Sequence, residues 1–96
     1  MITEVVHLHI LKGQSTAFED AFVEAQPLIE AAQGYIQHEL SKCMEKDDKY
    51  LLTVRWKTLE DHEPGFRQSN GYKEWKKILH HFYDPFPVVE HYKRIF

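Results

Sequence analysis

Hydrophobic and polar residues alternate along residues 4–13, near the start of the chain. Val6, Leu8 and Ile10 fall on one face of an extended segment, and apolar residues also occur on the other face. A period of two predicts a β-strand, and apolar residues on both faces predict that both faces are at least partly covered. Gly13 is expected to end this strand.

The spacing of apolar residues becomes helical over residues 15–34. Thr16 and Glu19 match a capping box, in which each side chain satisfies the free backbone N–H of the other residue. Gly34 is expected to end the helix. Pro27 removes an interior hydrogen bond, so a kink or a break is expected near it. The apolar stripe of this helix consists of Phe18, Ala21, Phe22, Ala25, Leu28, Ile29 and Ala32.

Two further strands are predicted at residues 35–45 and 50–56, joined by the polar turn 46–49. Strands joined this closely predict a hairpin. One face of the first of these strands carries Ile36, His38 and Leu40. One face of the second carries Tyr50, Leu52, Val54 and Trp56.

The second half of the chain completes the fold. Residues 58–68 include the Pro64-Gly65 pair and predict a short helical turn that breaks. Residues 69–82 predict a full helix capped by Ser69 or Asn70, with an apolar stripe of Tyr72, Trp75, Ile78, Leu79 and Phe82. A stiff connection at 83–87 leads to a last strand at 88–96. The order β-α-β-β-α-β predicts an α+β fold, a ferredoxin-like sandwich with a four-stranded antiparallel sheet and both helices on one face.

One face of such a sheet has no helices over it, yet the strands carry large or apolar residues on both faces. A second copy of the chain would cover this face, with two sheets packed into a barrel and the helices outside. The pattern therefore predicts a homodimer, because large exposed apolar patches are rare. The alternative is a curled monomer with a polar open face.

Length and composition restrict the function further. The 96 residues suffice for one small domain, residues 1–96. The formal net charge is −3 with acids and bases mixed, so nucleic acid is not expected as a partner. Cys43 is the one cysteine, which excludes a disulfide within the chain and fits a reducing cytoplasm. No signal peptide and no membrane span are predicted, so a cytoplasmic protein is expected.

A family resemblance rests on residues 50–75, where a strand ending in Trp56 runs into a helix. The pattern F-x-x-S-x-x-Y-x-x-W stands there at positions 66, 69, 72 and 75. With the rest of the chain, this segment resembles the antibiotic biosynthesis monooxygenase family of the dimeric α/β-barrel superfamily. The resemblance implies a homodimer with one pocket per subunit, between the helices and the sheet. Some members of the family oxidise aromatic substrates with oxygen and without metal or flavin, others cleave haem, and others have no known activity.

The family's functional positions match this chain only in part. The Asn, Trp and His of the haem-degrading members fall on Val6, Phe66 and Lys76, so the resemblance does not extend to haem degradation. The cofactor-free oxygenases have a Trp at the end of the third strand, which Trp56 matches. An Asn that they carry on the same face falls on Leu52.

Histidine is the candidate general base, since it titrates near neutral pH and there are seven in the chain. His38 is the first choice because it interrupts an otherwise apolar strand face; the alternative is a core histidine with a structural partner. His80 is the second choice, at the end of the second long helix, where the helix dipole alone could explain it. His7 and His9 share a strand face but lack a third ligand, so no metal site is predicted.

These considerations predict a cofactor-independent monooxygenase that acts on a small aromatic or enolic substrate, with His38 or His80 as base. The expected substrate-binding residues are Trp56, His62, Phe66, Tyr72 and Tyr83, with His62 on a lid and residues 80–92 as a rigid pocket wall. Neither a cofactor nor a metal is expected. The alternatives are a non-catalytic dimer of the same fold that binds a small molecule and, more remotely, a haem-binding or haem-degrading protein.

Overall fold

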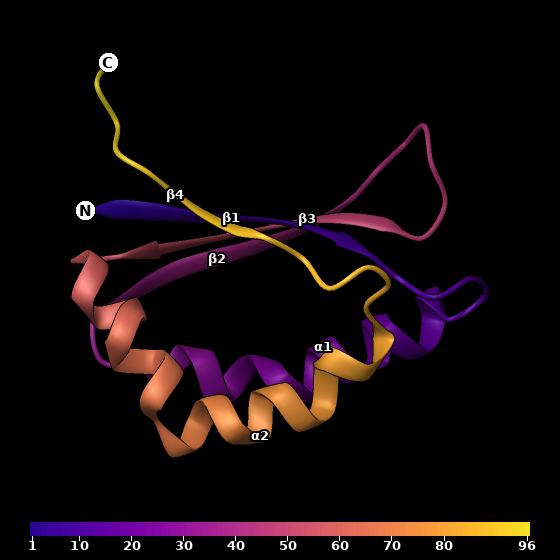
Figure 1. Ribbon diagram of the computed structural model, residues 1–96, viewed down its shortest axis with the longest axis horizontal. Coiled ribbons are helices and arrows are strands. Elements are labelled where there is room, and N and C mark those ends of the chain that lie inside the picture. Colours follow the sequence, from indigo (N-terminus) through magenta and orange to yellow (C-terminus); the bar gives the residue numbers. More distant parts are fainter.

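The computed structural model describes all 96 residues and has a four-stranded antiparallel sheet at its centre (Figure 1). The strands are β1 (Ile2–His9), β2 (Tyr35–Lys42), β3 (Lys49–Trp56) and β4 (Val89–Tyr92). Their order in the sheet is β2-β3-β1-β4, which confirms the predicted ferredoxin-like topology.

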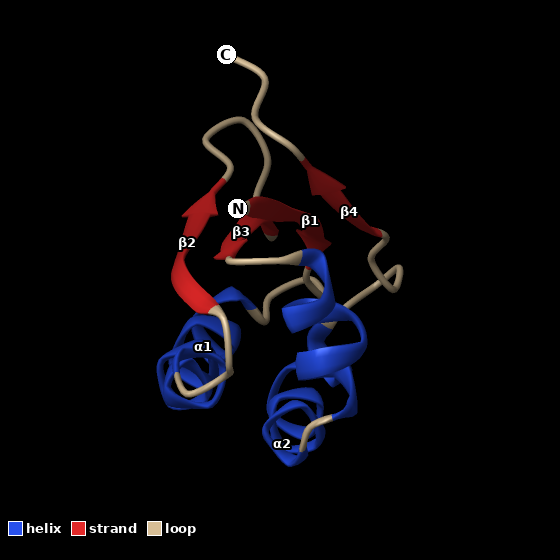
Figure 2. Ribbon diagram, turned by 90° about the vertical axis from the view of Figure 1, so that its left-hand side faces the viewer, coloured by secondary structure: helices blue, strands red, loops and turns tan.

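Two long helices, α1 (Ser15–Glu30) and α2 (Asn70–Leu79), lie side by side on the same face of the sheet (Figure 2). Three short helical turns complete the chain: η1 (Asp61–Gly65), η2 (Phe66–Gln68) and η3 (His80–Phe82). The turns η1 and η2 lead from the end of β3 into α2, as the broken helix at 58–68 predicted. No helix combines the length and the apolar character needed to cross a bilayer.

The core lies between the sheet and the two long helices. Alternate residues of β1 and β3 point into it, as their period of two predicted. Aromatic side chains from α1 and α2 fill the space opposite, and Phe22 meets Trp75 with ring centroids 5.7 Å apart. The fully buried members of largest volume are Trp56, Phe18, Leu8, Ile29, Leu79 and Val54.

Two details of α1 differ from the prediction. The helix begins at Ser15 without a side-chain cap, so Thr16 lies inside the first turn and the capping box is wrong. The Ser15 hydroxyl instead donates a hydrogen bond to Asp48 on the β2–β3 turn. Pro27 does not break the helix, because Pro27 and the residue one turn before it, Val23, are both exposed. Water can therefore satisfy the carbonyl that proline leaves free.

A register shift in β2 corrects a second detail. Tyr35 pairs with Trp56 and Gln37 with Arg55, so Ile36 is an extra residue between them. Such a bulge moves the side chain of Ile36 off the inner face, where it was predicted to lie with His38 and Leu40. Ile36 is accordingly exposed, and Tyr35 packs against the core in its place.

The last strand is shorter than predicted, because β4 pairs with β1 only from Val89 to Tyr92. Tyr92 lies opposite Thr3, close to the start of β1, so the residues that follow have almost no strand left to pair with. Residues 93–96 extend away from the sheet (Figure 1). The helix α2 begins as predicted, since Ser69 is its N-cap and accepts a hydrogen bond from the backbone N–H of Tyr72.

Candidate functional site

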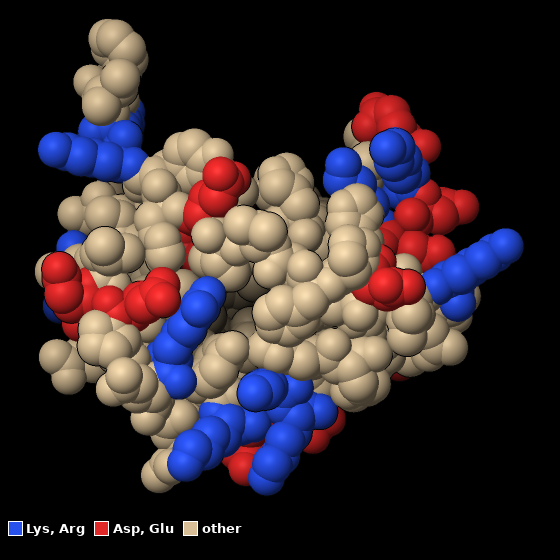
Figure 3. Space-filling view, in the orientation of Figure 1, with Lys and Arg blue, Asp and Glu red and all other residues tan.

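A cavity of about 310 Å³ lies between the sheet and α2. Residues from β1, β3 and β4 form its floor, and residues from α1, η1, η2, α2 and the segment after α2 form its walls. Figure 3 shows a hollow between the sheet and the helices on the corresponding face, with a basic side chain beside it. Its volume is at the lower end of the range for small-molecule sites.

Glu4 is the unexpected residue of this cavity. It points inward from β1, in phase with Val6 and Leu8, and only 6% of it is exposed. The indole N–H of Trp56 donates a hydrogen bond to Oε1 of Glu4 across 3.0 Å. Burial raises the pKa of Glu4 to about 7, against smaller opposing effects of the Trp56 hydrogen bond and the charge of Arg67. Glu4 therefore changes its charge near neutral pH.

His62 lies against both of these residues. Its imidazole stacks on Trp56, with ring centroids 5.3 Å apart and an interplanar angle of 21°. Its Nε2 is 3.4 Å from Oε1 of Glu4. Burial, helped by the charges of Arg67 and His91, lowers the pKa of His62 to about 4. His62 is therefore a neutral imidazole at neutral pH, able to donate with one ring nitrogen and accept with the other.

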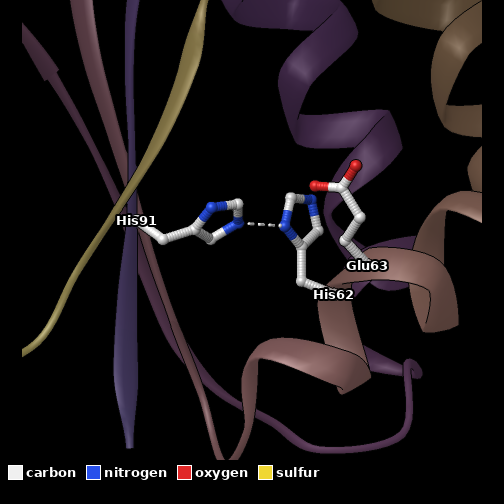
Figure 4. A group of neighbouring side chains, drawn as sticks. All are labelled: His62, Glu63 and His91. Carbon is white, nitrogen blue, oxygen red and sulfur yellow. Dashed lines mark hydrogen bonds between the residues drawn. The ribbon is translucent and has the colours of Figure 1, made fainter.

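The other ring nitrogen of His62 points to β4. Its Nδ1 is 2.8 Å from Nε2 of His91 (Figure 4). The strand register explains this contact, because His91 pairs with Glu4 across β1 and β4 and so points to the same side of the sheet. Glu4, His62 and His91 thus form one continuous row of polar atoms.

A metal ion is the other occupant that this cluster could hold. His62, Glu63 and His91 each bring one potential ligand atom within 4.8 Å of the others (Figure 4). A tetrahedral zinc ion about 2.0–2.1 Å from two imidazole nitrogens would hold them about 3.3 Å apart. The observed 2.8 Å between the two nitrogens is instead the distance of a shared proton. Glu63 is exposed and lies 3.7 Å from Arg67. The geometry therefore favours a hydrogen-bonded pair of histidines.

Aromatic side chains form the wall of the cavity near the end of α2. The imidazole of His80 lies among three rings, with centroid distances of 5.8 Å to Tyr72, 5.4 Å to Tyr83 and 5.1 Å to Phe86. Burial, with the charges of Lys76 and Arg67, lowers the pKa of His80 to about 4. Burial also raises the pKa of Tyr83, so its hydroxyl stays protonated and remains a hydrogen-bond donor.

The segment after α2 holds this wall in place. Tyr83 forms a bridge with Ile10, and the backbone N–H of Asp84 donates to the carbonyl of His9 across 2.8 Å. Phe86 and Pro87 then line the cavity before β4 begins. These contacts with residues 9 and 10 place residues 80–87 along one side of the cavity, as part of the segment 80–92 that was expected to form a wall.

Five of the predicted site residues come together around the cavity. These are His62, Phe66, Tyr72, His80 and Tyr83. Trp56 does not reach the cavity surface, because it is fully buried beneath Glu4, His62 and Phe66. Trp56 therefore lies behind the cavity wall, where it contacts the side chains of Glu4 and His62.

His38 lies outside the cavity. Its Nδ1 is 2.6 Å from the hydroxyl of Tyr35, and its Nε2 is 2.8 Å from Oε1 of Gln26. His38 is too far from the cavity because it lies on β2, the edge strand furthest from β4, whereas the cavity lies under β1, β3 and β4. Both ring nitrogens have structural partners, so the geometry does not support His38 as the base.

Sequence reasoning missed Glu4, although a signal was present. A glutamate two positions before Val6 continues the inward face of the first strand, and an acidic residue in phase with a core face is unusual. The sequence pattern assigns no role to His91, and only the pairing of β4 with β1 places it against His62. His7 and His9 are exposed on the opposite face of the sheet.

Comparison with known proteins places the chain in a family. The model of the antibiotic biosynthesis monooxygenase family matches residues 1–78, and the chain belongs to that family. It is 56% identical to the uncharacterised protein YczJ of Bacillus subtilis (strain 168) over 95 residues, which cover 99% of this chain and all of that protein.

Two solved structures show the same fold. One, from Bordetella bronchiseptica, carries the name of this family; it superposes with a TM-score of 0.94 at 29% identity and covers 99% of this chain and 97% of its own. SnoaB of Streptomyces nogalater, described as a cofactor-independent oxygenase, superposes with a TM-score of 0.79 at 18% identity. That alignment covers 99% of this chain and 94% of SnoaB.

Proposed function

We propose that this protein is a cofactor-independent monooxygenase that oxidises a small aromatic or enolic molecule in the cavity between the sheet and α2. The observation that carries the proposal is Glu4, a buried carboxyl with a pKa near 7 on the floor of a cavity with aromatic walls. A base is most effective when its pKa lies near the working pH. Membership in the family and the likeness to SnoaB support the type of reaction.

The first step is the removal of a proton from the substrate. The carboxylate of Glu4 would take it from a phenol, an enol or a methylene group between aromatic rings. His80 is a poorer base, because its pKa of about 4 leaves little driving force to hold the proton. Tyr83 keeps its hydroxyl proton and can donate a hydrogen bond to the anion that forms.

The substrate anion then supplies every electron that reduces oxygen. For an activated methylene, one oxygen atom becomes the new C=O group, and the other leaves as water with the two hydrogens of the methylene. The carbon is oxidised and O₂ is reduced, so the balance needs no external reductant. The protein's contribution is a base, a largely apolar cavity and hydrogen-bond donors for the anion.

Glu4 also provides a polar group in a cavity that lacks the Asn of the cofactor-free oxygenases. The position where the cofactor-free oxygenases carry Asn is Leu52, an apolar residue of the cavity in this chain. Leu52 lies opposite Val6 in the β1–β3 ladder, and Glu4 is the next inward residue on β1. We therefore assign the polar role in this cavity to Glu4 and no longer to His38.

Oxygen uptake tests the proposal. Metal-stripped protein would be mixed with a panel of hydroquinones, anthrones and flavonols, and oxygen consumption would be followed with an electrode. We expect uptake that saturates with one compound, falls by about 10²–10⁴-fold in Glu4→Gln, as for loss of a general base, and is retained in His38→Ala. Tight binding without uptake would replace the enzyme by a small-molecule-binding protein. A Soret band on mixing with haemin would support the haem alternative.

The proposed assembly is a homodimer that buries the open face of the sheet. Figure 2 shows that both long helices lie on one side and that no element covers the other. Val5, Leu51 and Thr53 are half-buried on the uncovered side, and Val5 pairs with Thr53 in the ladder. Light scattering after size exclusion should give twice the chain mass, and Leu51→Glu should give the monomer mass.

A further inference from the structure

A row of polar atoms leads from the floor of the cavity to β4. It begins at Oε1 of Glu4, which Trp56 holds with its indole N–H. The next atom is Nε2 of His62, which lies 3.4 Å from Oε1 of Glu4. On the other side of the same ring, Nδ1 of His62 lies 2.8 Å from Nε2 of His91, where the row ends. Figure 4 shows the two imidazoles with facing nitrogens. The three residues come from β1, η1 and β4.

The far end of this row is open to water. His91 is only partly buried, and its Nδ1 makes no hydrogen bond to the protein. Every buried side-chain nitrogen or oxygen of this protein has a hydrogen-bond partner. The Nδ1 of His91 is therefore reached by solvent, whereas Glu4 at the other end is almost fully buried.

The row can hold its protons in two complete arrangements. When Glu4 is protonated, its hydroxyl can donate to Nε2 of His62, Nδ1–H of His62 donates to Nε2 of His91, and His91 carries its proton on Nδ1. When Glu4 is ionised, each proton moves by one place: Nε2–H of His62 donates to Glu4, and Nε2–H of His91 donates to Nδ1 of His62. The arrangements differ by one proton, which leaves from Nδ1 of His91.

We propose that Glu4, His62 and His91 form a proton relay, in which the ionisation of Glu4 switches the tautomers of both histidines and releases the proton to water at β4. The coupled ionisation and tautomer change would occur in the free protein, without a substrate. Its use in catalysis rests on the proposed function, because it would return a buried base to its charged form. His62 and His91 act through Glu4, which is the member of this row that would take the proton from the substrate.

Other charged groups face the relay from the elements packed against it. Arg67 of η2 favours the carboxylate of Glu4 and the neutral form of His62. Glu63 of η1 acts on Glu4 in the opposite sense. The hydroxyl of Tyr83, on the segment after α2, also faces Glu4. Because burial and the charge of Arg67 keep the imidazole of His62 neutral, we expect Glu4 to change its charge while His62 changes only its tautomer.

Nuclear magnetic resonance of ¹⁵N-histidine-labelled protein tests this relay without substrate. Two-bond ¹H–¹⁵N spectra separate protonated from bare ring nitrogens, and they would be recorded from about pH 6 to about pH 9, around the pKa of Glu4. We expect His62 and His91 to exchange tautomer together, with one midpoint, as Glu4 ionises. In Glu4→Gln the concerted transition should vanish. His38 serves as an internal control, since its nitrogens bind Tyr35 and Gln26 instead.

A second variant separates the relay from simple loss of structure. In His91→Phe the fold should persist, because the residue is only partly buried and the ring volume is similar. Carboxyl exchange at Glu4, read from ¹³C line shapes, should become slower while its pKa stays near neutral. A single His62 tautomer across the whole range, or a tautomer switch that survives Glu4→Gln, would overturn the relay. Stoichiometric Zn²⁺ binding that shifts both histidines would overturn it in favour of a metal site.

Discussion

The indole N–H of Trp56, at the end of β3, donates a hydrogen bond to Oε1 of Glu4, near the start of β1. The family resemblance suggested Trp56 as a wall residue, but its side chain is fully buried and meets the carboxyl from behind. A donor aimed at a carboxylate favours the ionised form. Burial acts in the opposite direction and is the larger effect, so the pKa of Glu4 remains near 7.

Trp56→Phe should therefore raise the pKa of Glu4 above 7, because burial remains and the donor is lost. Loss of a hydrogen bond to a charged group should also cost about 1.5–3 kcal/mol of unfolding free energy above the pKa of Glu4. The ¹³C chemical shift of the Glu4 carboxyl, followed against pH, gives the pKa. Trp75→Phe is the matched control, since Trp75 is also buried beside the cavity but makes no hydrogen bond to Glu4. An equal shift in both variants would contradict the assignment.

Glu4→Gln should make the protein more stable at alkaline pH. The folded pKa of about 7 exceeds the ordinary value of 4.5, so folding favours the protonated carboxyl. This favourable contribution is fully present below about pH 4.5 and is lost as the pH rises through about 7. The loss corresponds to about 3 kcal/mol, and glutamine, which cannot ionise, does not suffer it.

Urea unfolding of both proteins at a series of pH values measures this effect. The difference in unfolding free energy between Glu4→Gln and the parent should grow between about pH 4.5 and about pH 7 and then level off. The folded pKa of His62 is about 4 and its ordinary value is 6.5, so both proteins also gain stability from His62 as the pH rises between these values, and the difference between the two proteins removes this shared contribution. A difference that stays constant with pH would mean that Glu4 titrates like an exposed carboxyl.

Most of the fold could be predicted from the chain, because strands and helices bury different spacings of apolar residues. Val6, Leu8 and Ile10 alternate and are buried, and the α1 stripe includes Phe18 and Phe22, which are buried too. The errors in the strands are backbone events with no side-chain signature. The extra residue in β2 and the early end of β4 depend on where neighbouring strands begin and end.

The candidate site could be predicted only in part, because its polar residues come from separate elements. The aromatic wall lies mainly on α2 and the residues after it, so helical spacing was sufficient to find Tyr72 and His80. The row Glu4–His62–His91 depends on the β1–β4 register and on the path of the loop after β3. His38 shows the converse, because a residue on the inner face of an edge strand need not face the cavity.

Ser69→Ala should loosen the junction between the cavity wall and α2. The Ser69 hydroxyl accepts from the backbone N–H of Tyr72 across 3.1 Å and donates to the carbonyl of Phe66 across 2.6 Å. Loss of an N-cap costs about 1 kcal/mol. Urea unfolding should show this loss in Ser69→Ala, much less of it in Ser69→Asp, and almost none in the control Asn70→Ala at the next, exposed position. Equal losses in all three variants would contradict the role of Ser69 as the N-cap of α2.

Gly34→Ala should damage the protein far more than Gly13→Ala, although the two glycines have nearly the same backbone conformation. Their φ values are +80° and +78°, so the strain of alanine in the left-handed region, about 1 kcal/mol, is common to both. A Cβ on Gly13 would meet nothing within 4 Å. A Cβ on Gly34 would lie 2.1 Å from the carboxyl of Asp61.

Asp61 cannot move aside without a loss. Its carboxylate accepts hydrogen bonds from the backbone N–H and the hydroxyl of Thr58, and it begins the turn that carries His62. Gly34→Ala should therefore cost about 1–3 kcal/mol beyond the Gly13→Ala loss. It should also disturb the His62 resonances, which Gly13→Ala should leave in place. Equal unfolding free energies for the two variants would mean that the turn adapts freely, and His62 would then lack the fixed support that a relay through its two nitrogens requires.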